Sequence, residues 1–132
     1  MKHKIVYNND FGGYALSDKA IEWLSEHGSE RTKKFIAQKR IEANAKIMDY
    51  ASKFRGTADN TRKFYIMDAV RSFLKRHDPD LVAVVEALGK EVNGTFSSLA
   101  IEEIDVDEYY IDEYDGKETI ITPEDICWTA IS

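Results

Sequence analysis

The chain has 132 residues and a formal net charge of −6, a length that suits one domain around a single core. Apolar residues make up 43% and charged residues 32%, which is ordinary for a soluble globular protein. The negative charge argues against nonspecific binding of nucleic acid by the molecule as a whole. A single cysteine, Cys127, excludes an internal disulfide and a multi-cysteine metal site.

The first elements along the chain are a short strand and a turn. Residues Lys4 to Tyr7 are β-branched and aromatic, which indicates a strand. A cluster of turn-forming residues follows: Asn9, Asp10, Gly12 and Gly13. Because such a turn between a strand and a helix can present backbone amides, an anion-binding turn is an alternative to a plain tight turn.

Helix signals come next. Ser17 is a typical N-cap, Leu16 and Ile21 have hydrophobic-staple spacing, and Gly28 is a usual stop. Between residues 31 and 76, apolar side chains recur at near-helical spacing with lysines and arginines between them. A break at residues 55–60 divides this segment, so we expect a basic helical hairpin.

The C-terminal half begins with Asp78 as a cap and Pro79 at the first helical position. After the Asn93-Gly94 turn, a strand is expected from Leu99 to about Val106. Residues 109–114 and 118–122 flank Asp115-Gly116, a strong hairpin signal that places Ile111 opposite Ile120. Trp128 and Ile131 suggest that the tail packs against the body.

These signals predict one α+β domain over residues 1–132. A small antiparallel sheet from the two ends packs against three or four helices, and the basic segment 31–76 is inserted between the sheet-forming ends.

Charge is strongly segregated along the chain. Residues 31–76 hold thirteen Lys and Arg against four Asp and Glu, or +9, whereas residues 77–132 hold two against fifteen, or −13. Three interpretations are open. The basic helices could simply cover an acidic sheet, they could face a phosphate-bearing ligand, or the acidic part could dock on a basic protein or imitate nucleic acid.

Candidate functional residues follow from these interpretations. On the basic helices we expect binding by Lys33, Lys34, Lys39, Arg40, Arg55, Arg62 and Lys63. On the acidic strands the candidates are Glu102, Glu103, Asp112 and Glu113. The three histidines lack a metal-ligand spacing, and no catalytic signature is present, so neither a metal nor another cofactor is expected.

The sequence resembles a widespread group of small uncharacterised proteins encoded by phages and prophages. Shared motifs are the YND, Gly-Gly-aromatic and Leu-Ser start, the DPxLVxVVExLG helix, the Asn-Gly turn and the EYDG hairpin, which together cover about half of the chain. An extra Asn in the first motif and a longer, more basic middle depart from the pattern. The resemblance implies a viral accessory protein, and it implies no particular biochemical activity.

The sequence therefore favours a non-enzymatic accessory protein. It would bind a host protein or an anionic nucleotide or nucleic acid, as an inhibitor of host antiviral defence. The alternative is a small enzyme that acts on a phosphate-containing substrate through Asp10 with the Gly12-Gly13 turn, or through Glu102 and Glu113.

The start of the chain lacks a signal-peptide pattern and no apolar run approaches the roughly 20 residues of a membrane span. We therefore expect a protein of the host cytoplasm that could form a homo-oligomer.

Overall fold

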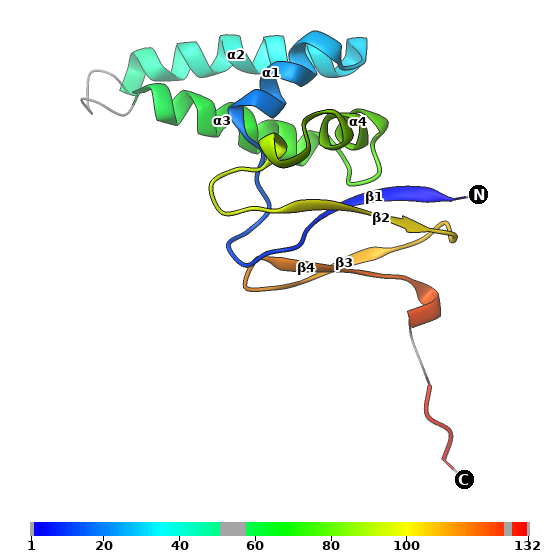
Figure 1. The fold of residues 1–132 in the computed structure, drawn as a ribbon. Helices are drawn as coiled ribbons and strands as arrows, with labels where there is room; N and C mark the ends of the chain where they lie inside the picture. Colours follow the sequence, from blue (N-terminus) through cyan, green and yellow to red (C-terminus); the bar gives the residue numbers. More distant parts are fainter. Residues whose placement is uncertain (1, 51–57, 126–127, 132) are drawn as a thin grey trace.

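The computed structural model describes residues 2–50, 58–125 and 128–131 and has three layers (Figure 1). One layer holds the helices α1 (Asp18–His27), α2 (Glu30–Tyr50), α3 (Ala58–Phe73) and α4 (Pro79–Leu88). The middle layer pairs β1 (His3–Asn8) with β2 (Leu99–Ile104), and below it lies the hairpin of β3 (Tyr110–Tyr114) and β4 (Lys117–Ile121). Short 3-10 turns cover Gly89–Val92 and Pro123–Asp125. The predicted α+β class is confirmed.

Two hydrophobic cores hold these layers together. Side chains alternate along β1, so Val6 joins the core formed with the helices, whereas Ile5 points to the opposite side of the sheet. There Ile5 meets Ile104 and Ile120 in a smaller core between the β1–β2 sheet and the hairpin. The β1–β2 sheet is thus covered on both faces.

The predicted sheet is divided within the described residues. β1 pairs antiparallel with β2, β3 pairs with β4, and no ladder joins β1 to β4. The outward amides of β1 bond elsewhere: Val6 N–H donates to the Arg76 carbonyl (2.8 Å) and Asn8 N–H donates to the Glu118 carboxylate (2.7 Å). A buried side chain and a carbonyl of the turn between α3 and α4 therefore satisfy the edge of β1 in place of a third strand.

The predicted helix starts are confirmed. Ser17 Oγ accepts a hydrogen bond from Ala20 N–H (3.2 Å), and Asp78 Oδ1 accepts one from Asp80 N–H (2.9 Å) with Pro79 beside it. Each cap satisfies an amide that the first helical turn leaves unpaired. None of the helices in the described parts of the chain is long and apolar enough to span a membrane.

The helical hairpin is also confirmed, because the rings of Phe35 on α2 and Phe73 on α3 stack with centroids 3.9 Å apart. Of the predicted break at residues 55–60, residues 55–57 lie outside the described residues, and the break is wrong at residues 58–60, which already belong to α3. Cys127 also lies outside the described residues. Asp80 of α4 is hydrogen-bonded to the start of α2. Its carboxylate accepts hydrogen bonds from the hydroxyls of Ser29 (2.7 Å) and Thr32. Burial alone would raise the pKa of Asp80, but these hydrogen bonds outweigh it and lower the pKa.

The C-terminal hairpin follows the prediction, and the tail does not. Asp115 and Gly116 have φ values of 55° and 90°, as a two-residue primed turn requires, and Ile111 stands opposite Ile120. Trp128, expected to pack, is instead 89% exposed, and Ile131 is fully exposed. Residues 128–131 extend away from the body (Figure 1). The prediction failed because a lone indole in a sequence carries no signal for whether a packing partner is present.

Candidate functional site

At least three of the six described cations that were predicted to bind an anion are paired with carboxylates. Lys33 lies 4.0 Å from Glu30 and Lys39 lies 3.0 Å from Glu42 on the same helix, while Lys63 Nζ lies 3.3 Å from Asp18 on α1. Outside that set, Arg31 pairs with Asp78 at 2.7 Å and Arg71 with Asp68 at 2.6 Å. The +9 segment therefore offers a polyanion far fewer unpaired charges than its composition suggests.

The predicted cations also do not form one patch. Arg40 and Lys63 line a hollow of about 210 Å³ among α1, α2 and α3, together with the carboxylates of Asp18 and Glu22. Lys39 hydrogen-bonds with Glu42 instead, and this bond raises the pKa of Lys39 and lowers that of Glu42. Lys34 is exposed and Arg62 is half-buried, so the structure brings together only Arg40 and Lys63 of the described set.

The N-terminal turn is engaged in packing. Asn9 N–H donates to the Ser98 carbonyl (2.8 Å), Phe11 N–H to Asp10 Oδ1 (2.8 Å) and Gly12 N–H to the Asp115 carbonyl (3.1 Å). The tip of the β3–β4 hairpin closes over Gly13 so tightly that a Cβ on Gly116 would lie 2.1 Å from Gly13 N. These contacts occupy amides that an anion would need, and they dock the hairpin onto the turn.

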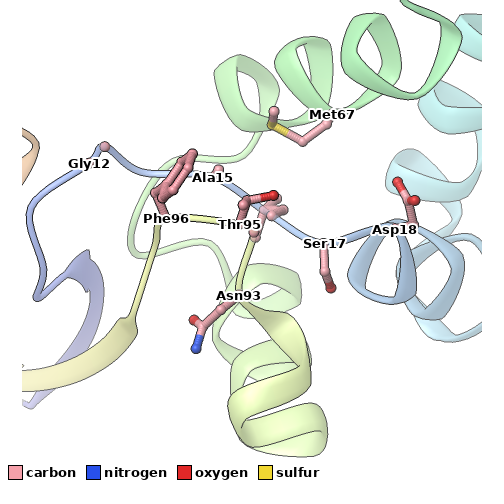
Figure 2. Close-up of a pocket in the computed structure, with 11 residues that line it drawn as sticks. Gly12, Ala15, Ser17, Asp18, Met67, Asn93, Thr95 and Phe96 are labelled. Carbon is pink, nitrogen blue, oxygen red and sulfur yellow. The ribbon is translucent and has the colours of Figure 1, made fainter. Parts of the chain in front are cut away.

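Beside this turn lies an open hollow of about 520 Å³ (Figure 2). Phe96, with 70% of its surface exposed, stands against Gly12 on one side, and Met67 of α3 borders another. The start of α1 at Ser17 and Asp18 lies at the far end. Ser17 Oγ already accepts a hydrogen bond from Ala20 N–H and donates one to the Glu91 carbonyl, so this hydroxyl is engaged within the fold.

A second hollow, of about 500 Å³, lies between the end of α3 and the inner side of the β3–β4 hairpin. Its wall contains the ion pair of Arg76 with Glu118, whose side chains are 19% and 7% exposed. The Arg76 guanidinium also lies 3.7 Å from the centre of the Tyr14 ring. The Tyr14 hydroxyl is buried and has no hydrogen-bond partner among the described residues, and burial raises the pKa of Tyr14 to about 12.

The predicted acidic residues are all exposed but do not share one face. Glu103 stands opposite Lys4 on the helix side of the β1–β2 sheet, whereas Glu102 stands opposite Ile5 on the hairpin side. Asp112 points away from the core, and Glu113 lines the second hollow, where its Oε1 accepts the Gly116 N–H. Alternation along each strand separates neighbouring carboxylates in this way.

Around the hairpin the negative charge is concentrated. Residues 105–125 hold nine Asp and Glu against the single cation Lys117, or −8. Among the described residues, no lysine or arginine forms an ion pair with the four predicted acidic residues, and Asp107 meets only His3, at 2.9 Å. Unlike the paired cations of the helices, the carboxylates of Glu102, Glu103, Asp112 and Glu113 have no lysine or arginine partner within the described residues.

The outer face of the hairpin adds two residues that were not predicted from the sequence. We define the hairpin face by the side chains that point away from the core, namely Tyr110, Asp112, Tyr114, Lys117, Thr119 and Ile121. Tyr110 is 57% and Tyr114 is 77% exposed. The two-residue spacing Tyr-x-Asp-x-Tyr was the signal, because it puts all three side chains on one side of a strand.

The carboxylates proposed for catalysis are not assembled. Asp10 is exposed and accepts a hydrogen bond from its neighbour Phe11, while Glu102 and Glu113 belong to separate sheets. Within the described residues, no group of three His, Cys, Asp or Glu side chains could hold a metal ion.

No family model, curated protein or solved structure matches the chain. The described residues form an α+β domain with an acidic hairpin that exposes Tyr110 and Tyr114 on its outer face.

Proposed function

We propose that this chain is a non-enzymatic accessory protein that docks on a basic protein partner through the hairpin face. The observation that carries the proposal is the pair of exposed tyrosines, Tyr110 and Tyr114, on either side of Asp112 in a segment of net charge −8. Tyrosines are enriched at the centres of protein interfaces, and a charged rim selects partners of opposite sign.

The distribution of paired charge supports the acidic side of the molecule over the basic one. Cations of α2 and α3 are largely paired within the chain, as for Lys39 with Glu42 and Lys63 with Asp18. A nucleic acid would have to displace these carboxylates, whereas a basic protein can approach the hairpin without breaking an ion pair of Asp112 or Glu113.

The resemblance to phage-encoded proteins gives the partner its context. A phage accessory protein would act on host components, and a host protein that handles nucleic acid carries a basic surface that complements an acidic hairpin. We therefore propose a nucleic-acid-binding protein of the host cytoplasm as the partner and inhibition of antiviral defence as the outcome.

Affinity capture with matched variants tests the proposal. Tagged wild-type protein, Tyr110→Ala/Tyr114→Ala and Phe64→Ala would be incubated with lysate of a bacterial host, and captured proteins would be identified and then rebound in purified form. Phe64 is the control because its exposed fraction of 62% on α3 is similar to that of the tyrosines. We expect a basic protein that is lost with the tyrosine variant and kept with the control, and equal capture by all three would refute the proposal.

Charge reversal separates the competing surfaces. Changing Lys33, Lys34, Lys39 and Arg40 to Glu should leave capture by the hairpin face unchanged. Loss of the partner in that variant, with the tyrosine variant unaffected, would place the site on the basic helices. Turnover of a phosphate-containing substrate that disappears in Asp10→Asn would instead establish the enzyme.

A further inference from the structure

The outer edge of β3 pairs with no other strand of the described residues. β3 pairs with β4 alone among the described strands, and Tyr114 stands opposite Lys117 at the two-residue turn. In such a hairpin the residues next to the turn exchange hydrogen bonds and the pattern then alternates. Tyr110, Asp112 and Tyr114 therefore bond to β4, whereas the N–H and C=O groups of Ile111 and Glu113 point away from it.

We infer that an extended basic segment of the partner adds to β3 as a further strand, pairing with the backbone of Ile111 and Glu113. This inference rests on the proposed docking function and specifies how the same surface is used. Strand addition to an open edge gains affinity from backbone hydrogen bonds and specificity from alternate side chains.

The surroundings of the edge define the side chains that the added strand should carry. On the outer side, each second residue would lie beside Tyr110, Asp112 and Tyr114, where lysine or arginine gains a carboxylate and aromatic rings. On the inner side, the alternate residues would enter the hollow of about 500 Å³ that Ile111 and Glu113 line. The fitting pattern is therefore basic outward and small or apolar inward, with a period of two residues.

Charge also decides against a second copy of this chain as the occupant. Two β3 edges placed together would set Asp112 and Glu113 of one copy beside the same residues of the other, inside segments of charge −8 each. Like charges directly opposite on neighbouring strands are destabilising, and charged side chains on an edge are a common protection against self-association. The same carboxylates attract a basic strand.

A synthetic peptide, acetyl-Lys-Val-Lys-Val-Lys-Val-Lys-amide, is the direct probe, with the Asp-for-Lys peptide as its control. Amide hydrogen exchange would be followed by NMR with and without saturating peptide. We expect exchange at Ile111 and Glu113 to slow at least tenfold, while the amide of Asp112, already bonded to β4, changes little. The acidic peptide should have no effect. Unchanged exchange at both outward amides would overturn the inference.

Two substitutions at one position separate the backbone from the side chain. Glu113→Pro removes an outward N–H without removing a bond to β4, a place where an edge strand accepts proline. Glu113→Ala removes the same carboxylate and keeps the N–H. We expect at least tenfold weaker peptide binding in Glu113→Pro than in Glu113→Ala, and equal affinities would contradict strand addition. If the proline variant does not fold, the exchange measurement on the wild-type protein decides alone.

Failure of this inference can be told apart from failure of the proposed function. If Asp112→Lys weakens peptide binding while the Ile111 and Glu113 amides stay unprotected, the hairpin face binds basic chains through side chains only, and strand addition is wrong. If neither Asp112→Lys nor Tyr114→Ala changes binding of the peptide or of the captured partner, the docking function is wrong as well.

Discussion

The buried carboxylate of Glu118 is the residue whose removal should damage this fold most clearly. It accepts hydrogen bonds from both terminal nitrogens of Arg76, the second at 2.8 Å, and from Asn8 N–H at 2.7 Å. Glu118→Ala would leave a guanidinium and an amide without a partner at the junction of β1 and β4. Removing one member of a buried ion pair costs about 3–5 kcal/mol.

The expected loss lies near the lower end of that range, because the Arg76 side chain keeps 19% of its surface exposed and can recover part of its hydration. We expect about 3 kcal/mol, which in urea corresponds to a midpoint lower by roughly 1–3 M for ordinary slopes. Equilibrium unfolding followed by circular dichroism measures the change directly.

An exposed ion pair is the matched control. Lys19 Nζ lies 3.1 Å from Glu91 Oε1, and both side chains are more than half exposed, so Glu91→Ala should cost less than about 1 kcal/mol. Replacing Arg76 and Glu118 together by methionine should restore much of the stability, since no charge is then buried alone. A loss below 1 kcal/mol for Glu118→Ala would refute the view that this pair joins the two sheets.

Three further changes test other parts of the structure. Gly116→Ala should lower the free energy of unfolding by about 2 kcal/mol or more, and thermal melts should show a smaller loss for Gly13→Ala. Both glycines have positive φ, but only a Cβ at Gly116 would meet backbone atoms, 2.1 Å from Gly13 N. Tyr14→Phe should leave stability at pH 7 unchanged or higher, since the hydroxyl has no hydrogen-bond partner in the described part of the chain. A pKa of about 12 for Tyr14 means that folding favours the neutral phenol. The contribution of Tyr14 to folding stability is therefore complete below the unfolded pKa of about 10 and is lost as the pH rises toward 12. Alkaline unfolding of the phenylalanine variant should lack this loss of stability. Because the pKa of Asp80 is lowered, the contribution of this carboxylate to folding stability is complete above the unfolded pKa of about 3.9 and is lost as the pH falls through the pKa of the folded state. The stability difference between Asp80→Asn and wild type should therefore shrink in urea melts below about pH 4.

Interactions within a few residues were predictable from the sequence. The Ser17 and Asp78 caps, the Asp115-Gly116 turn and the Ile111–Ile120 register are all present as expected. Each depends on the conformational preference or hydrogen-bonding reach of neighbouring residues, so the local pattern carries the full signal. The class of fold follows from the order of such elements.

The division of the sheet and the location of unpaired charge were decided by tertiary structure. Glu118 belongs to a hairpin with an acidic composition, yet it is buried because Arg76, 42 residues away, reaches its carboxylate. Contacts of this separation leave no periodic trace in one sequence. The sequence thus determined which helices, turns and charges exist, and the packing of distant segments decided which charges neutralise one another and which strand edge stays open.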